Sequence, residues 1–269
     1  MSGLRVWVQG VGLLGPGMSS WASSQEVLRG ALAHVNVPTV LPVPVRLPAA
    51  ERRRAGAAVK LAMAVADEAV AQAQVDPAVL ATVFSSSSGE CANCDAMCVA
   101  LAMPTPVVSP TKFTNSVHNA SSGAWHIAVA SRAPSTSLCA FNGSFGAGLI
   151  EAASNVCLSK EPVLLVASDS PYPEPLHSAR PLPDHFGVAL LLTPAATERS
   201  LAVLNIQLAS SQPGARALAS APLETLRRVI PAAAALPLLV ALAQGKQQHG
   251  LVVDYLPEMG LHVDLEPLA

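Results

Sequence analysis

The chain has 269 residues, of which 51% are hydrophobic and only 13% are charged, and its formal net charge is -2. Disordered chains have the opposite balance, so this composition excludes disorder for the chain as a whole. A net charge so close to zero gives no electrostatic footprint for nucleic acid. The scarcity of charge also indicates a buried interface with a partner, because the cores of interfaces are depleted in charged residues.

The first elements in chain order are a buried strand, expected over residues 4–9, and a glycine-rich turn. Residues 10–15, GVGLLG, match the GxGxxG pattern of dinucleotide-binding sites. However, Pro16 and Gly17 fall where the phosphate-binding helix should run, and no acidic residue lies near positions 30–35 to hold a ribose. The pattern therefore predicts a turn beneath a sheet, and no bound cofactor.

The following elements alternate between helices and apolar strands. A proline-rich loop is expected over 36–50, and Pro110 keeps residues 107–113 extended or turn-like. Helices are expected over residues 50–74, 91–102, 115–130, 143–159 and 230–243. Strands are expected over residues 81–85, 135–141, 162–168, 186–193, 201–208, 250–255 and 260–265. Strands that are apolar on both faces and alternate with helices predict an α/β sandwich with a covered sheet, with a seam only near 211–222.

Targeting and redox signals favour a cytoplasmic protein. The longest apolar run, residues 229–243, is 15 residues long and contains two prolines, whereas a membrane span needs about 20 residues. The N-terminal segment is not a convincing signal peptide. With no secretion signal, the five cysteines are expected to be reduced thiols.

Cys91, Cys94 and Cys98 have the spacing of a metal-binding cluster. Three thiolates are one ligand short of a closed zinc site, although His118 and His126 lie downstream. On a helix the three cysteines would share one face, where a buried cysteine packs as a small hydrophobe. We therefore expect core packing and no metal, with a metal-binding or redox module as the alternative.

Residues 137–152, SLCAFNGSFGAGLIEA, predict a strand that enters a tight turn at the start of a glycine-rich helix. Such an elbow lifts the residue at its apex into a cavity at the helix N-terminus, where a cysteine would have a lowered pKa and act as a nucleophile. The candidates for the apex are Cys139 and Asn142. Phe145, Leu149, Ala153 and Val156 would form the buried face of the helix.

Three further polar residues have both a functional and a structural explanation. His118 and His126 lie eight positions apart on an expected helix, so one could reach a cavity, although a hydrogen-bonded histidine at a helix or dimer interface is favoured. Asp169 follows an apolar strand, a position that often carries function in α/β sheets, but it could equally cap the next turn.

Four segments of the chain resemble the β-ketoacyl synthase-like N-terminal family, which comprises shortened ketosynthase relatives found beside aryl-polyene and related type II fatty-acid or polyketide machinery. The segments are VWVQGVGLLGPG near the N-terminus, SPTKFTNSVHNASSGAW at 109–125, SLCAFNGSFGAGLIEA at 137–152, and DHFGVALLL at 184–192. The second segment is the most specific of them. The resemblance covers about residues 1–195.

This resemblance implies a thiolase-like layered sandwich, αβαβα, with a complete N-terminal half at 1–195 and a truncated C-terminal part at 196–269 packed on the same domain. In ketosynthases the elbow cysteine takes the acyl chain from acyl carrier protein, and two histidines of the C-terminal half support condensation. An ungapped alignment places Asn142 at the nucleophile position and Cys139 three residues earlier, on the strand. There we expect Cys139 to be buried, which would disfavour its thiolate. His249 and His262 lack the glycine-rich context of the family's histidines.

The departure at Asn142 makes a non-catalytic, chain-length-factor-like subunit the leading hypothesis. Such a subunit would pair with a catalytic ketosynthase paralogue, or with itself, and would shape the acyl tunnel served by acyl carrier protein. Residues 113–142 would form the interface, with the strand 135–141 added to the partner's sheet. The expected tunnel and interface residues are Asn115, His118, Asn119, Trp125, Phe141 and Phe145. The alternatives are a minimal condensing enzyme or acyltransferase that uses Cys139 and, third, the cysteine-cluster protein.

Overall fold

The computed structural model describes residues 3–210 and 216–268. Its strands are β1 (Leu4–Leu14), β2 (Ala81–Ser85), β3 (Ser135–Leu138), β4 (Val163–Asp169), β5 (Phe186–Thr193), β6 (Ala202–Ser210), β7 (Gln248–Leu256) and β8 (Met259–Pro267). Its α-helices are α1 (Trp21–Arg29), α2 (Ala49–Arg54), α3 (Ala57–Ala73), α4 (Cys91–Leu101), α5 (Pro110–Asn115), α6 (Ala120–Ala128), α7 (Ser144–Ser159), α8 (Leu176–Ala179), α9 (Ala221–Val229) and α10 (Leu236–Gln244). Short 3-10 helices are η1 (Pro77–Val79), η2 (Phe141–Gly143) and η3 (Pro231–Ala235).

The eight strands form one mixed sheet in the order β3-β2-β4-β5-β1-β6-β8-β7. Strand β2 runs parallel to β3 and β4, and the other neighbours are antiparallel. Strands β4 and β5 are buried along their whole length, because helices cover both faces. The predicted α/β class with a covered sheet is therefore confirmed.

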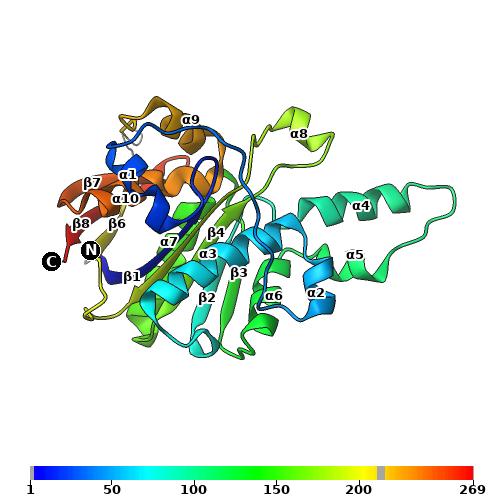
Figure 1. Ribbon diagram of the computed structural model, residues 1–269, viewed down its shortest axis with the longest axis horizontal. Helices are drawn as coiled ribbons and strands as arrows, with labels where there is room; N and C mark the ends of the chain where they lie inside the picture. The colour runs from blue at the N-terminus through cyan, green and yellow to red at the C-terminus, as the bar shows by residue number, and fades with distance from the viewer. Residues whose placement is uncertain (1–2, 211–215, 269) are drawn as a thin grey trace.

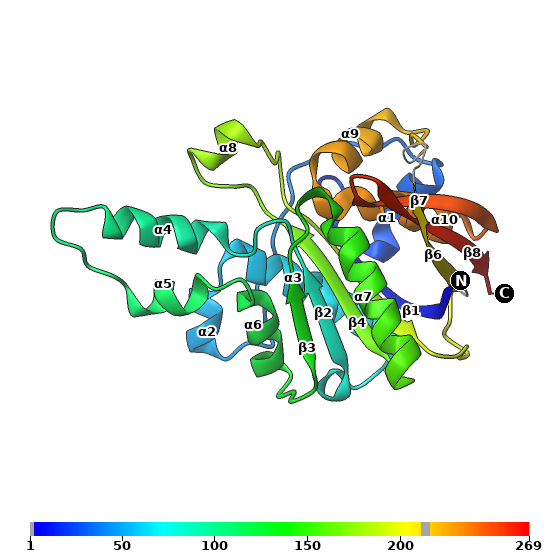
Figure 2. The same cartoon turned by 180° about the vertical axis from the view of Figure 1, so that it is seen from behind.

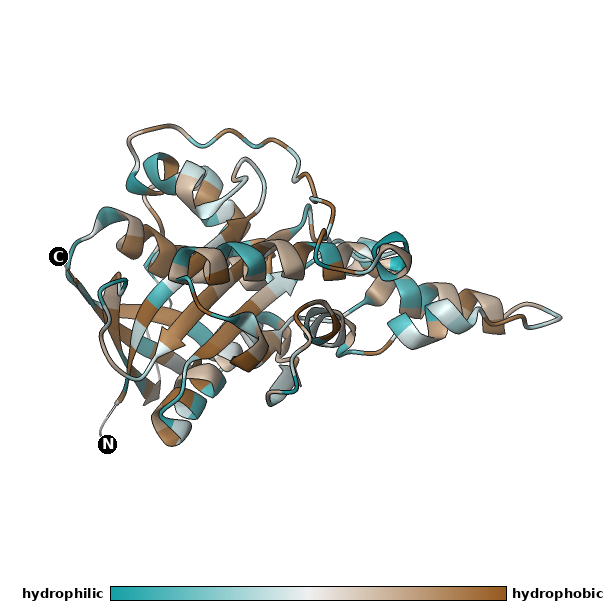
Figure 3. Ribbon diagram, turned by 60° about the horizontal axis from the view of Figure 1, so that its bottom comes forward, coloured by the Kyte–Doolittle hydropathy of each residue, from teal (hydrophilic) through white to brown (hydrophobic). Residues whose placement is uncertain are grey.

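Helices α3 and α7 lie on opposite faces of the sheet (Figures 1 and 2). Helix α3 packs on β1, β5 and β4 and forms one core with Trp125 of α6. Helix α7 packs on β4, β2 and β1 and also contacts β7 and η3. The C-terminal strands β6, β8 and β7 continue the sheet that the N-terminal strands form. Helix α7 therefore packs in a second, larger core, in contact with β4 and β2 and also with β7. The central strands of the sheet are mostly hydrophobic (Figure 3).

The predicted glycine turn at residues 10–15 is wrong, because Gly10 and Gly12 lie inside β1. Both face α3 at close range. A Cβ atom would lie 2.2 Å from the Ala69 carbonyl oxygen at Gly10, and 1.9 Å from the Val65 carbonyl oxygen at Gly12. Glycine is therefore required here for the close approach of a helix to a strand, and not for a turn.

The other differences from the predicted elements have local causes. The helix expected over 50–74 is divided into α2 and α3 at Gly56, where a Cβ would meet the Glu90 carboxylate at 2.6 Å. The segment 110–115 is the helix α5, because Ser109 caps it and Pro110 occupies its first turn, where proline is tolerated. The helix expected over 115–130 begins only at Ala120. Helix α9 occupies part of the proposed seam at 211–222, of which 211–215 lie outside the described residues.

Helices α4 and α5 form an arm that projects from the body of the protein (Figures 1 and 2). No residue of α4 is buried. Cys94 and Cys98 are exposed, so the predicted core packing is wrong for these two, whereas Cys91 is half-buried and packs against the larger core. Within residues 3–210 and 216–268, no group of three or more His, Cys, Asp or Glu side chains is placed to hold a metal ion.

None of the helices in the described part of the chain is long and apolar enough to cross a membrane. The apolar run near the C-terminus is divided between η3 and α10, which pack in the larger core.

Candidate functional site

The candidate site is the elbow between β3 and α7. Strand β3 ends at Leu138, and the chain turns through η2 before α7 begins at Ser144. Phe141 has a φ angle of 51°, in the left-handed region that a bulky residue seldom adopts. A tight elbow is therefore present where the sequence predicted one.

Ser144 holds the elbow from the inside. Its Oγ accepts a hydrogen bond from the Ala140 amide at 3.1 Å. The same Oγ lies 2.8 Å from the Phe141 carbonyl oxygen and 3.1 Å from that of Ser86, either of which can accept its proton. Ser144 is buried, so these bonds offset the cost of burying its hydroxyl.

Two glycines at the start of α7 allow β7 to cover the base of the elbow. A Cβ atom at Gly143 would lie 1.8 Å from the Tyr255 carbonyl oxygen, and one at Gly146 would lie 2.3 Å from that of Asp254. Gly143 and Gly146 are therefore required by the close approach of a strand that lies more than a hundred residues further along the chain.

Asn142 is exposed at the elbow, and its Oδ1 accepts a hydrogen bond from the Arg180 guanidinium. Arg180 also donates to the Tyr172 hydroxyl at 2.9 Å, and its Cζ lies 3.7 Å from the centre of the Phe141 ring. The Tyr172 and Ser87 hydroxyls are 2.6 Å apart. These contacts join the elbow to the loops that follow β4 and β2.

Asp169, at the end of β4, holds the loop after β2 and the helix η3 through hydrogen bonds. It is buried, and its two oxygens accept hydrogen bonds from the Ser87 and Ala232 amides, each at 2.7 Å. Burial raises the pKa of the Asp169 carboxyl, while the Ser87 and Ala232 hydrogen bonds and the Arg180 charge oppose the increase. These contacts are structural, but they bind the loop after β2 and η3, so the predicted cap of the next turn is wrong.

Cys139 lies just beyond β3 and is exposed, which corrects the expectation that it is buried on the strand. Strand β3 ends one residue earlier because the chain already turns toward the elbow. Its Sγ is 3.5 Å from His118 Nδ1. Loss of solvent around the thiol raises its pKa, and the Asp169 and Cys91 charges raise it further, against a lowering by the Ser86 hydrogen bond. The thiolate is thus disfavoured, as predicted, and loss of solvent is the main cause, although Cys139 lies beyond the strand.

The other expected site residues are dispersed around the elbow. Asn115 ends α5 and is half-buried, while Asn119 is exposed before α6. Trp125 and Phe145 have no exposed surface and pack in the two separate cores. Because this chain itself buries both rings, neither one reaches a partner directly from these positions.

The two histidines do not share a helix face. His118 lies in the loop before α6, whereas His126 lies within α6 and is 3.0 Å from the Thr82 hydroxyl. Burial lowers the pKa of His126. His126 is thus a hydrogen-bonded helix histidine, as favoured from the sequence.

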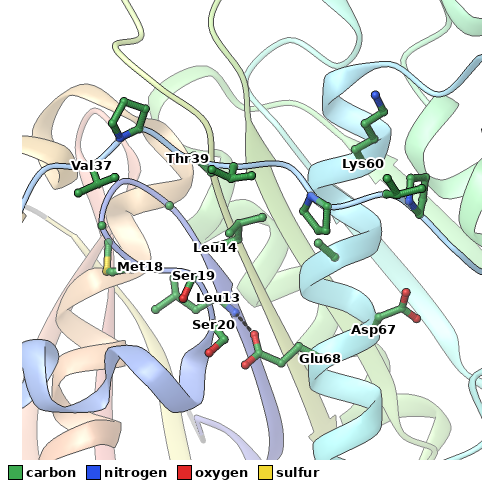
Figure 4. A pocket seen from close by; sticks show the side chains of 18 of the residues that line it. Leu13, Leu14, Met18, Ser19, Ser20, Val37, Thr39, Lys60, Asp67 and Glu68 are labelled. Carbon is green, nitrogen blue, oxygen red and sulfur yellow. Dashed lines mark hydrogen bonds between the residues drawn. The ribbon is translucent and has the colours of Figure 1, made fainter.

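A cavity of about 670 Å³ lies away from the elbow, between the end of β1, helix α3 and the proline-rich segment 37–45 (Figure 4). Glu68 at its base accepts hydrogen bonds from the Leu13 and Trp21 amides at 2.9 and 2.7 Å. Asp67 is paired with Arg46. None of the elbow residues lines this cavity.

The mixed sheet, and the elbow that leads from its edge strand into a buried helix, agree with the thiolase-like α/β fold that the resemblance implied. Residues 19–246 match the model of the family described as Beta-ketoacyl synthase, N-terminal domain. The match spans most of the 269 residues, and the chain belongs to this family. No curated protein sequence matches it.

Solved structures with the same fold cover nearly the whole chain. One is the ketosynthase ApeO in complex with its chain length factor ApeC from Xenorhabdus doucetiae, with 24% identity, a TM-score of 0.73 and coverage of 97% of this chain and 99% of that one. Another is the ishigamide ketosynthase/chain length factor, with 14% identity, a TM-score of 0.74 and coverage of 99% and 100%. A third is AntDE:AntF, a type II PKS acyl-carrier protein in complex with its ketosynthase, with 12% identity, a TM-score of 0.75 and coverage of 98% and 99%.

Sequence analysis did not identify Arg180 as part of the site. It lies in the proline-rich loop after β4, 38 residues from Asn142. One signal was present, because Arg180 is the only lysine or arginine between Lys160 and Arg199. A lone cation in a loop that follows a buried strand of an α/β sheet is a candidate for the site at the strand ends.

Proposed function

We propose that this protein is a non-catalytic, chain-length-factor-like subunit that pairs with an active β-ketoacyl-ACP synthase and shapes its acyl tunnel. The observation that carries the proposal is Asn142 at the elbow, in the position that the family resemblance gives to the nucleophilic cysteine. A carboxamide forms hydrogen bonds but supplies no nucleophile for an acyl chain. Its oxygen is also occupied by Arg180.

The exposed apolar side chains of the arm, of the segment from Val117 to α6 and of the elbow support pairing. Val99, Leu101, Met103, Val107, Phe113, Val117, Ile127 and Phe141 are each between 45% and 76% exposed. Extended apolar surface on a single chain usually marks a contact with another protein. The solved structures named above include a ketosynthase with its chain length factor, and a contact of that kind would cover the arm.

The expected centre of the contact remains residues 113–142. Strand β3 ends the sheet, so its outer edge is open to pair with a strand of another chain. Asn115, His118 and Asn119 are uncharged, and can therefore hydrogen-bond across a dry contact without the desolvation cost of ions. Phe141, and not the buried Phe145, would face the partner's tunnel.

The decisive experiment is co-expression with a ketosynthase that has an elbow cysteine and is encoded beside this chain. We expect a heterodimer on size-exclusion chromatography. Cerulenin, an electrophile that mimics an acyl chain, should label the partner only. Phe141→Ala should change the length distribution of the products, while Leu158→Ala, at an exposed leucine of α7, should not. A chain that stays monomeric beside its partner would refute the pairing; a homodimer would favour self-association.

One contact favours a second candidate, a minimal acyltransferase or condensing enzyme. The Cys139 thiol lies 3.5 Å from His118, and a cysteine beside a histidine base is a common nucleophile pair. Stoichiometric labelling of Cys139 by cerulenin, abolished by His118→Ala, would favour this enzyme. An unmodified Cys139 favours the partner subunit.

The proposed partners also include acyl carrier protein, which would deliver chains to the pair. All five cysteines are free thiols, which fits a reducing compartment, and we place the subunit in the cytoplasm. The division into 1–195 and 196–269 remains a prediction, which limited proteolysis near residue 195 would test.

A further inference from the structure

The Arg180–Asn142 contact fixes which end of the Asn142 amide faces outward. An arginine guanidinium carries only donors, so the amide must turn its oxygen toward Arg180. The amide nitrogen then points away from Arg180, and within the described residues its Nδ2 has no hydrogen-bond partner. Because Asn142 is exposed, the elbow offers an outward-facing N–H₂ donor pair at the position of the family's nucleophile.

The same guanidinium holds the other exposed group of the elbow. Its Cζ lies 3.7 Å from the Phe141 ring centre and 5.6 Å from that of Tyr172. A cation over an aromatic face is attracted by the ring, and the planar guanidinium also stacks on it. Phe141 is 61% exposed, and the Arg180 contact restrains its ring.

Arg180 is in turn held by a network that leads to the interior. It donates to Tyr172, which is 5% exposed, and the Tyr172 hydroxyl meets Ser87, whose amide donates to the buried Asp169. A guanidinium anchored in this way has a defined position, unlike a free surface arginine. Its anchoring contacts lie outside the elbow, on the loops after β4 and β2.

We infer that Arg180 is the positioning residue of this elbow. It orients the Asn142 amide as a donor toward a carbonyl oxygen and holds the Phe141 ring beside that donor. A carbonyl oxygen is the acceptor that an outward amide N–H₂ recognises next to an apolar ring. The orientation does not depend on the proposed pairing, whereas the source of the carbonyl, the acyl chain or the partner's backbone, rests on it.

The positioning role is tested on the isolated chain by NMR. The Asn142 side-chain N–H₂ signals of ¹⁵N-labelled protein are identified by their loss in Asn142→Asp. We expect their ¹⁵N heteronuclear NOE to exceed that of the exposed Asn36, to fall to that level in Arg180→Ala and to fall partly in Arg180→Lys, which keeps the charge but not the fork.

A matched control is Arg199→Ala, which removes another arginine bound to a side-chain amide, that of Gln74. It should leave the Asn142 signals unchanged. A structural role alone would change the unfolding midpoint of Arg180→Ala without changing this local NOE. Equal NOE values for Asn142 in the wild type and Arg180→Ala would overturn the inference.

The source of the carbonyl is tested by comparing the wild type with Asn142→Asp in complex with the co-purifying ketosynthase. This substitution keeps the Arg180 contact but replaces the amide donor by a carboxylate acceptor. If the carbonyl belongs to the partner's backbone, association should weaken about tenfold, as for a lost buried hydrogen bond of about 1.4 kcal/mol. If the carbonyl belongs to the acyl chain, the affinity for the ketosynthase should be unchanged, whereas the length distribution of the products should shift. No change in either quantity would overturn carbonyl recognition.

The failure of the pairing and of the positioning role are distinguishable. A wild-type chain that binds no ketosynthase refutes the proposed function and the carbonyl contact with it. The NMR comparison then still decides whether Arg180 orients Asn142.

Discussion

Glu224 of α9 is the residue for which the structure gives the sharpest prediction of stability. Its carboxylate accepts two hydrogen bonds from Arg227, each at 2.8 Å, one from Arg228 at 2.7 Å and one from the Leu218 amide at 3.1 Å. The Arg227 hydrogen bond, followed by those of Arg228 and Leu218, lowers the pKa of Glu224 from 4.5 to about 2 against the effect of burial. Arg227 also reaches Asp254 of β7 at 3.3 Å, so Glu224 helps to hold α9 beside the strand that covers the elbow.

The stabilisation follows from the lowered pKa. Each tenfold change in proton affinity corresponds to about 1.36 kcal/mol, so a pKa of about 2 in place of 4.5 corresponds to at most about 3.4 kcal/mol. The Glu224 and Arg227 side chains are only 11% and 9% exposed, but Arg228 is 68% exposed and screened by water. We therefore expect Glu224→Gln to lower the free energy of unfolding by about 2 kcal/mol at pH 7.

The pH dependence gives the sign of the effect. Because the pKa is lower in the folded state, the stabilisation is complete above about pH 5 and is lost as the pH falls from 4.5 toward 2. Urea denaturation at pH 7, 5, 4 and 3 should show the wild type and Glu224→Gln converging. Glu161→Gln, at an exposed glutamate, should stay within about 0.5 kcal/mol of the wild type throughout. A difference that is independent of pH would refute the electrostatic explanation.

Three further predictions concern the elbow and its surroundings. Gly143→Ala should cost at least about 2 kcal/mol in urea denaturation, because its Cβ would meet the Tyr255 carbonyl oxygen at 1.8 Å. Gly123→Ala, in a helix and with no atom within 4 Å, should instead stabilise by up to about 1 kcal/mol; equal effects of the two would contradict the close approach of β7. Alkylation of Cys139 by iodoacetamide, followed by mass spectrometry, should give a pKa above the ordinary thiol value of 9.0, and a value well below it would support the enzyme hypothesis. The pKa of His126 in an NMR titration should lie below 6.5, so that its contribution to stability falls as the pH drops below 6.5; a midpoint above 6.5 would contradict its burial.

The local pattern of hydrophobic residues correctly predicted the strands that are covered on both faces and the helix α7. Strands β4 and β5 are continuous apolar runs found within one residue of their expected ends, and α7 buries the expected face with Phe145, Leu149 and Val156. Burial on both faces leaves an uninterrupted hydrophobic signal. The tight turn before α7 was predicted for another reason, because the sequence changes from a strand to a glycine-rich helix within a few residues.

Glycine and cysteine were misinterpreted where their role depends on a distant neighbour. Gly10 and Gly12 indicate a turn in the sequence, but they are required by the approach of α3 to β1. The spacing of Cys94 and Cys98 is that of a helix face, yet the arm carries that face away from the core. A residue pattern records the periodicity of a helix but not whether another element covers it.

The sequence by itself determined the α/β class, the positions of the main strands along the chain, and the elbow. Only the tertiary structure decided what surrounds Asn142. Arg180 and Asp254 lie far from it along the chain and reach the elbow through a loop and through the last strand of the sheet. Such contacts depend on how the sheet folds around α7, and short-range residue preferences carry no information about contacts between segments so far apart.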